Sequence, residues 1–202
     1  KLPIAVVGLG RFGTALALQL SDAGNEVLAV ASQPDLVQRL SGRLSQVVCA
    51  DATDADALRD VGLADFLRAV VAIGDDREAS ILSTSILSEF GVDDIWAKAL
   101  NDQHAAILRR VGAHHVILPE QDMCVRLAHL LSGGVLDYFE VDSDYVVGRV
   151  RPPRAVIGER VGDVKFVKKF NVSLAAVKVE FTESFAHPDP KTVLTYGTEL
   201  LV

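Results

Sequence analysis

Residues Ile4–Gly13 read I-A-V-V-G-L-G-R-F-G, and a helix-like stretch, T-A-L-A-L-Q-L, follows at once from Thr14. An apolar run that stops at a glycine, glycines spaced G-x-G-x-x-G and an immediate helix start predict a strand, a tight turn and a helix. Gly8 would permit the turn, Gly10 would let the backbone approach a pyrophosphate, and Gly13 would let the helix pack closely on the strand. Bare N–H groups at a helix start attract anions. The stretch therefore predicts a nucleotide held by its phosphates; the alternative is a glycine turn that binds nothing.

Apolar strand-like segments alternate with helix-like segments as far as about residue 135. This alternation predicts a parallel sheet covered by helices on both faces. With the glycine motif on the first strand, residues 1–138 are expected to form a doubly wound, Rossmann-type α/β domain. The expected strands are 4–7, 27–30, 46–49, 69–73, 94–98 and 115–118; the expected helices are 14–23, 36–44, one starting at 54, 77–90, 104–111 and 123–131.

The pattern changes after Tyr138, and residues 139–202 are expected to form a small α+β lobe. Residues 139–150 alternate like a half-buried strand, 161–170 carry a helical pattern, and 174–180 and 198–202 read as further strands. A lobe of this size suits a regulatory or dimerisation module, not a second catalytic domain. The chain starts without Met and stops within the last expected strand, so we expect a fragment with this lobe truncated.

Composition narrows the classes of protein that fit. Half of the 202 residues are hydrophobic, which supports a real core. The net charge of −7 argues against nucleic-acid partners. No apolar stretch is long enough to span a bilayer, so a role at a membrane would require a membrane partner. Cys49 and Cys124 lie in apolar contexts and are expected to be buried thiols in a reducing cytosol.

The second expected strand lacks a residue that nucleotide-binding domains normally use. Such a strand normally ends in Asp or Glu, which accepts hydrogen bonds from the adenosine ribose. Here the position is Ala31, followed by Ser32 and Gln33, which could bond a ribose without charge. No arginine follows to hold a 2′-phosphate, so we rank NADP below nucleotides with an unmodified ribose. A pocket with degraded binding is the alternative.

Further candidates follow the next strands, because the carboxyl ends of parallel strands border the ligand crevice. Asp51, with Ala52 and Thr53, could reach adenine or ribose, and Gly74 after Ile73 would let the backbone approach the nucleotide. The acids in these loops, Asp54, Asp75 and Asp76 among them, could instead cap helices. These loops are expected to complete the nucleotide pocket.

Charged residues near the loop and after the sixth strand have two interpretations each. Arg11 could contact a phosphate, in its own chain or in a neighbour's, or lie on the surface. Glu120 and Asp122 could ligate a cation or contact a partner subunit, although a capping pair is the better interpretation. The histidines share no ligand spacing and no nucleophile–base–acid arrangement stands out, so we expect neither a metal site nor catalysis.

Several motifs together resemble the RCK (KTN) domain and, more narrowly, the cytoplasmic gating subunits of Ktr/Trk-type potassium transporters. The resemblance covers nearly the whole chain, and the region from about 140 to 202 is similar to the family's C-terminal (TrkA-C) lobe. The motifs are Gly8–Gly13, Asp51–Thr53, Ala72–Gly74, Ile95–Ala99, Arg110–Ala113 and Pro119–Met123, with Pro152–Gly158 and Tyr196–Val202 in the lobe.

The resemblance implies a cytoplasmic subunit at the inner face of the cell membrane, bound to an integral-membrane potassium transporter. Homodimers would assemble into a homo-octameric ring whose shape responds to ATP or ADP, or to NAD(H). Arg11 would contact terminal phosphates and Glu120 would take part in the dimer contact. The C-terminal lobe could bind cyclic di-AMP near Val156, Ile157 and Val164. The nucleotide-binding residues expected are Gly8, Leu9, Gly10, Arg11, Phe12, Gly13, Ser32, Gln33, Asp51, Ala52, Thr53, Ile73, Gly74, Lys98 and Glu120.

Two other functions stay open at this point. An NAD(P)-dependent oxidoreductase would use the same fold, but the small C-terminal lobe offers no convincing set of substrate-handling residues. A structural ring component with a vestigial pocket is favoured by Ala31. We expect a non-enzymatic, nucleotide-sensing gating subunit for potassium uptake.

Overall fold

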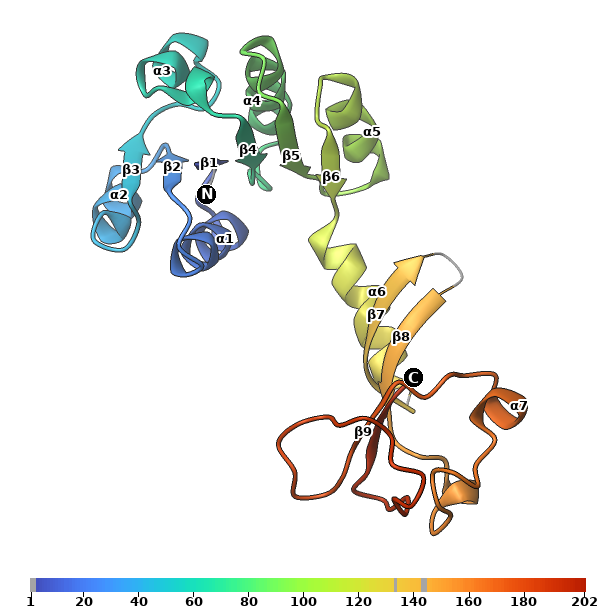
Figure 1. Cartoon of the computed structure of the whole chain (residues 1–202). Helices are drawn as coiled ribbons and strands as arrows, with labels where there is room; N and C mark the ends of the chain where they lie inside the picture. Colours follow the sequence, from blue (N-terminus) through green and yellow to red (C-terminus); the bar gives the residue numbers. More distant parts are fainter. Residues whose placement is uncertain (1–2, 133, 143–144) are drawn as a thin grey trace. The chain divides into compact units, whose positions relative to one another are not determined.

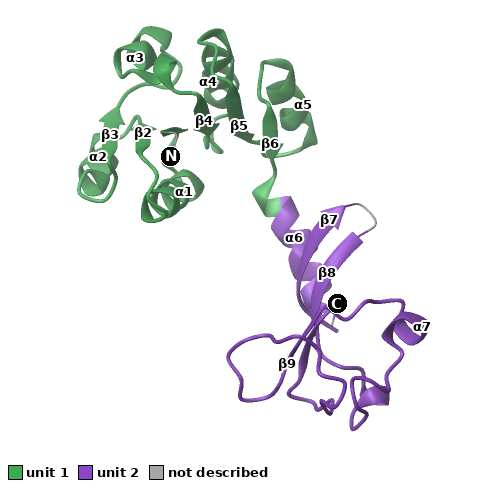
Figure 2. Ribbon diagram, viewed as in Figure 1, with its two compact units in different colours: residues 1–120 green, residues 121–202 purple. Residues whose placement is uncertain are grey.

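The computed structural model describes residues 3–132, 134–142 and 145–202 (Figure 1). The chain divides into two compact units, residues 1–120 and 121–202 (Figure 2). This division lies before the boundary expected at 138/139, because the helix after the sixth strand belongs almost entirely to the second unit. The assignment of residues 1–138 to one functional domain stays a prediction.

The first unit is built on a six-stranded parallel sheet in the order β3-β2-β1-β4-β5-β6. This order and the helical crossovers confirm the doubly wound Rossmann-type fold. Val7 at the end of β1 pairs with Val30 of β2 on one side and Val71 of β4 on the other. The strands are β1 Ile4–Val7, β2 Val27–Ala31, β3 Gln46–Cys49, β4 Arg68–Val71, β5 Asp94–Lys98 and β6 His115–Ile117.

Two hydrophobic cores cover the two faces of this sheet. One core packs α1 and α2 on the sheet through residues such as Ala17 and Leu40. The other packs α3, α4 and α5 through Leu58, Leu87 and Leu108 (Figure 1). β1 and β2 are buried along their whole length, which is why their sequences are continuously apolar. The helices are α1 Arg11–Asp22, α2 Pro34–Leu40, α3 Ala55–Asp60, α4 Arg77–Glu89 and α5 Asp102–Arg110, with a 3₁₀ turn at Leu63–Asp65.

The second unit carries a four-stranded antiparallel sheet in the order β7-β8-β10-β9 and a small core of its own. Arg126 of the long helix α6 pairs with Asp137 of β7, and His129 contacts Tyr138. This confirms a small α+β lobe. Its elements are α6 Pro119–Leu131, β7 Val135–Asp142, β8 Tyr145–Val150, a 3₁₀ turn at Arg154–Val156, α7 Phe166–Phe170, β9 Ala176–Lys178 and β10 Glu199–Leu201.

Three expectations for secondary structure and burial are wrong. The single strand expected at 139–150 is two strands, β7 and β8, that pair antiparallel; residues 143–144 lie outside the described part of the chain. The helix expected at 161–170 comprises only 166–170, because the N–H groups of Val161 and Gly162 donate to Thr192 and Pro190 instead. Cys49 and Cys124 are exposed, since one lies on edge strand β3 and the other on α6, which has no buried residue among those described.

Candidate nucleotide-binding site

A cleft of about 500 Å³ opens at the carboxyl ends of β1 to β4. This edge of a doubly wound sheet, beside the point where the strand order reverses, is where ligands bind in such folds. The expected site residues that line the cleft are Gly8, Leu9, Gly10, Ser32, Gln33, Asp51, Ala52, Thr53, Ile73 and Gly74. Arg11, Phe12, Gly13, Lys98 and Glu120 do not line it.

The three glycines of the loop have different structural roles. Gly8 has φ +91°, and a Cβ there would lie 2.6 Å from Ile73 Cγ1. A Cβ on Gly13 would lie 1.9 Å from the carbonyl oxygen of Gly8, so Gly13 sets how closely α1 packs on the loop. A Cβ on Gly10 would meet nothing within 4 Å. Gly8 and Gly13 are thus required by packing, whereas the space at Gly10 is open to a ligand.

The start of α1 has the features of an anion-binding site. Gly10 is its N-cap residue, no side chain among the described residues caps it, and its first turn holds no acid. The helix begins at Arg11, before the expected Thr14, so its N-terminus lies directly on the cleft-lining loop. The Thr14 side chain donates to the Leu9 carbonyl over 2.9 Å and braces the loop. Unpaired N–H groups and the positive end of the helix dipole therefore face a site without a fixed negative charge in that turn.

The wall formed by the end of β2 is apolar. Ala31, in the position of the usual acid, is buried and lines the cleft together with Val30 and Leu36. Ser32 and Gln33 follow it, and both are exposed. Ala31 therefore lies at the end of β2 in the cleft wall, at the position where the sequence placed it.

The acidic loops contain one constrained aspartate and two helix caps. Asp51 Oδ1 accepts hydrogen bonds from the Thr53 backbone N–H at 2.8 Å and from its hydroxyl at 2.7 Å. These bonds, the backbone one first, hold the pKa of Asp51 below its ordinary value. Asp54 caps α3 and Asp76 caps α4. The capping interpretation therefore applies to Asp54 and Asp76, although Asp76 also lines the cleft, as Asp51 does.

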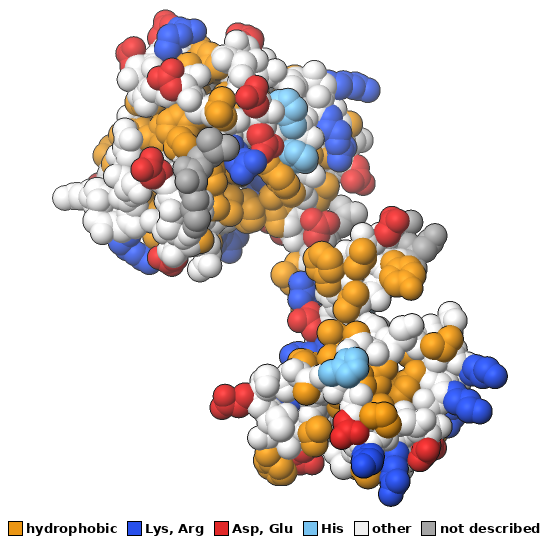
Figure 3. Space-filling view, viewed as in Figure 1, with side chains coloured by type: hydrophobic (Ala, Val, Ile, Leu, Met, Phe, Trp, Pro, Cys, Tyr) orange, Lys and Arg blue, Asp and Glu red, His pale blue; other side chains and the backbone are white. Residues whose placement is uncertain are grey.

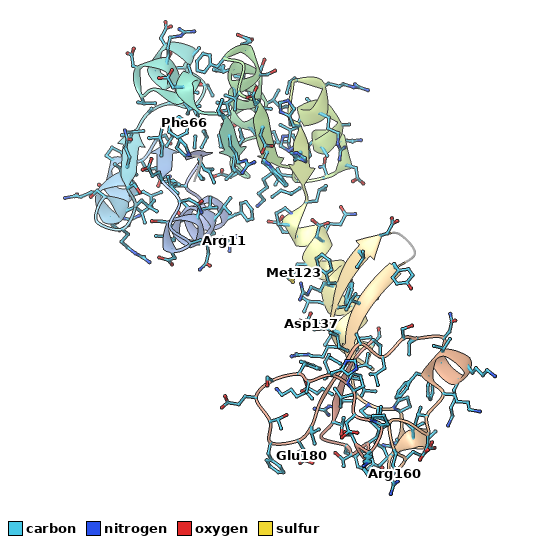
Figure 4. All side chains as sticks on the ribbon, viewed as in Figure 1. Arg11, Phe66, Met123, Asp137, Arg160 and Glu180 are labelled. Atoms are coloured by element: carbon cyan, nitrogen blue, oxygen red, sulfur yellow. The ribbon has the colours of Figure 1, made fainter. Side chains whose placement is uncertain are left out.

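A second group of charged residues lies beside the glycine loop. Lys98, buried at the end of β5, donates to Glu120 Oε1 over 2.7 Å, and its ammonium lies 5.5 Å from the centre of the Phe12 ring. A Cβ on Gly74 would lie 3.2 Å from the same ammonium. The hydrogen bond from Lys98 lowers the pKa of Glu120, with a smaller contribution from Arg11. Figure 4 labels Arg11 on the first turn of α1.

Sequence reasoning missed several lining residues. These are Ala50 and Ala72 at the strand ends and Ala79 on α4; Asp75 and Asp76, weighed above as possible helix caps, also line the cleft. The methyl side chains of the alanines carry no signal of binding, and only their position near the ends of strands 3 and 4 could have indicated them. Within the described ranges no cluster of three or more His, Cys, Asp and Glu side chains could hold a metal ion, and no helix has the length and hydropathy to cross a membrane.

Comparison with known proteins gives a consistent family. The TrkA-N domain model matches residues 4–119. The Ktr system potassium uptake protein C of Bacillus subtilis (strain 168) is 38% identical over 179 residues, 88% of this chain and 81% of that protein. The Ktr system potassium uptake protein A of Vibrio alginolyticus is 35% identical over 199 residues, 98% of this chain and 90% of that protein.

Solved structures show the same fold. The GsuK RCK domain superposes with a TM-score of 0.69 at 19% identity, covering all of this chain and 44% of that one. A GsuK channel bound to NAD gives 0.58 at 22% identity, covering all of this chain and 36% of that one. An AMP-bound Kef C-terminal domain of Shewanella denitrificans gives 0.56 at 25%, covering 65% and 82%. On the domain match and the sequence identities above, the chain belongs to the TrkA-N family of Ktr and Trk potassium uptake proteins.

Proposed function

We propose that this chain is a non-catalytic, nucleotide-sensing regulatory subunit of a potassium uptake system. The observation that carries the proposal is the uncapped start of α1 on an open cleft, in a chain related over most of its length to Ktr potassium uptake proteins. A nucleotide that binds one conformation of the assembly more tightly shifts the population toward it, and the attached transporter responds to the shift.

The ligand we propose is ATP or ADP, with NAD(H) as the second choice. Similar folds have been solved with NAD and with AMP, which supports an adenine nucleotide at this edge of the sheet. The buried ammonium of Lys98 beside the loop and Arg11 on the first turn of α1 supply positive charge near the expected phosphates. The carboxylate of Glu120 neutralises the charge of the Lys98 ammonium, so Arg11, Lys98 and Glu120 together carry a small net positive charge.

The assembly we propose is a homodimer that builds a homo-octameric ring on the cytoplasmic side of a membrane potassium transporter. Support comes from an apolar surface on the second unit, called here the α6–hairpin surface. Figure 3 shows hydrophobic side chains gathered there. Its exposed residues are Met123, Leu127 and Leu131 on one side of α6, with Phe139 and Val141 of β7 and Tyr145 of β8 on one face of the hairpin. An apolar surface of this kind indicates a protein partner.

Binding of cyclic di-AMP to the C-terminal lobe rests on the resemblance alone. Val156 and Val164 are buried in the lobe's core, so a ligand would have to use their backbone or Ile157. A thermal-shift screen of the chain with ATP, ADP, NAD, NADH and cyclic di-AMP tests all of these ligands. A ligand at hundredfold excess over its Kd is expected to stabilise the fold by about 2.7 kcal/mol. No shift with any of them would instead support a ring scaffold with a vestigial pocket.

Arg11→Ala tests the proposed sensing of the terminal phosphate. A guanidinium forms charge-assisted bonds with phosphate, so its loss is expected to weaken ATP more than ADP and to shrink the ratio of their Kd values. Isothermal titration calorimetry measures both constants, with Arg39→Ala, a basic residue on α2, as the control. Equal losses for the two nucleotides would contradict the role of Arg11.

Two further experiments test the function itself. Hydride-transfer assays test the oxidoreductase alternative, and measurement of potassium flux through the transporter tests the gating.

A further inference from the structure

The end of β2 lies where a nucleotide sugar would sit. β1 leads into the glycine loop, and its last residue, Val7, pairs with Val30 of β2. The Gly8 N–H donates to the Val30 carbonyl over 2.9 Å, which ties the loop to that strand end. Ala31 is the next residue and lines the cleft. A ribose joined to phosphates at the start of α1 therefore faces Ala31 and the residues after it.

The wall at this point offers no charged acceptor. A carboxylate here would accept the hydrogen of the ribose 2′-hydroxyl, whereas Ala31 presents a methyl group, only 6% exposed. Leu36 of α2 adds a second apolar side chain to the same cleft. A 2′-carbon without a hydroxyl would thus lose no charge-assisted bond against Ala31 and Leu36.

The polar groups nearby do not replace the missing acid. Ser32 and Gln33 are exposed and neutral, and bonds to neutral side chains in contact with water contribute little net binding. Asp51, on the loop after the neighbouring strand β3, accepts both Thr53 bonds on Oδ1 and is held in its own turn. Asp51 is thus oriented by its own turn, and it follows β3 rather than the end of β2, where Ala31 stands.

We propose that this chain does not read the ribose 2′-hydroxyl, so that 2′-deoxyadenine nucleotides bind about as tightly as their ribose counterparts. The proposal rests on the proposed function, since it specifies the ligand class of the same site. The residue at position 31 determines whether the 2′-hydroxyl is recognised, and the methyl group of Ala31 cannot accept a hydrogen bond from it.

Titration calorimetry of the full chain with ADP and 2′-deoxy-ADP tests the proposal directly. The two Kd values are expected to differ by less than about fivefold, because Ala31 offers no acceptor and the residues that follow it, Ser32 and Gln33, are neutral and exposed. A preference for ADP of about fivefold or more overturns the proposal while leaving nucleotide sensing intact. Failure of both to bind overturns the proposed function and this inference with it.

The substitution Ala31→Asp tests whether position 31 is responsible. It is expected to create a preference of about tenfold or more for ADP over 2′-deoxy-ADP, whereas Ala31→Asn, of similar size and uncharged, creates a smaller one. Thermal melting checks that each variant folds. A folded Ala31→Asp variant without this preference overturns the assignment. If Ala31→Asp does not fold, the ratio measured on the natural chain decides.

Discussion

Gly10 and Gly13 belong to one loop but differ in what an added methyl group would meet. A Cβ on Gly13 would lie 1.9 Å from the Gly8 carbonyl, so Gly13→Ala must displace α1 from the loop. We expect it to lower the free energy of unfolding by about 1–3 kcal/mol, the usual range for overpacking. Gly10→Ala has open space and should change it by no more than about 0.5 kcal/mol. Urea unfolding measures both, and equal stability of the two variants would show that the close approach is not maintained.

His104 predicts a loss of stability in mild acid. It is buried on α5, its Nδ1 accepts the Leu100 N–H at 3.3 Å, and its Nε2 has no hydrogen-bond partner among the described residues. Burial, and secondly the charge of Arg77, lowers its pKa below the ordinary 6.5. The unfolded chain therefore binds a proton at His104 more readily than the folded chain does. The stability that neutral His104 contributes is retained above pH 6.5 and falls as the pH drops below it.

The measurement is the melting temperature between about pH 7.5 and about pH 5.5. His104→Gln is expected to lose less on acidification than the natural chain, because it removes the group that must stay neutral. His187→Gln, at an exposed position, is the matched control and should keep the natural slope. Identical slopes for all three proteins would sink the idea that His104 governs acid sensitivity.

At the scale of elements, the cap of α3 makes a local prediction. The Asp54 carboxylate accepts from the N–H groups of Asp56 and Ala57, so Asp54→Ala leaves both without that partner. Loss of such a cap costs about 1 kcal/mol. Asp56→Ala removes an exposed ion pair with Arg59 and an acid from the first turn but no cap, and should cost less than Asp54→Ala. Chemical unfolding compares them, and the reverse order would contradict the capping role.

The elements also show what sequence patterns can and cannot predict. β1 and β2 were predictable because both faces of each strand are buried, which demands continuous apolar residues. The region 161–165 has helical periodicity, yet its backbone pairs with the distant segment 190–194, and no local pattern contains that partner. The helical periodicity of this region is real, but the backbone pairs with a distant segment and no helix forms there.

The site also contains residues that the sequence could predict and residues that it could not. The cleft-lining residues of the glycine loop and the strand ends were predictable, since topology brings the carboxyl ends of parallel strands together. The contacts of Lys98 with Glu120 and Phe12 join residues from β5, α6 and α1, and side-chain packing across three elements is not encoded by any spacing. For Lys98 only the resemblance to a family supplied the expectation, and for Glu120 the residues alone left a helix cap as the better interpretation.

At the scale of the whole molecule, the α6–hairpin surface predicts self-association. Leu127 on α6 is 46% exposed beside other apolar side chains, and burying this surface in a second copy would gain about 25 cal/mol per Å². Leu127→Glu would bury an unpaired charge in that contact and is expected to dissociate the dimer. Val167→Glu on α7, where Val167 is 63% exposed outside this surface, is the matched control and should leave the dimer intact. Sedimentation velocity measures the mass of each protein. A dimer that survives Leu127→Glu would place the subunit contact elsewhere, and a natural chain that is monomeric at high concentration would contradict self-association.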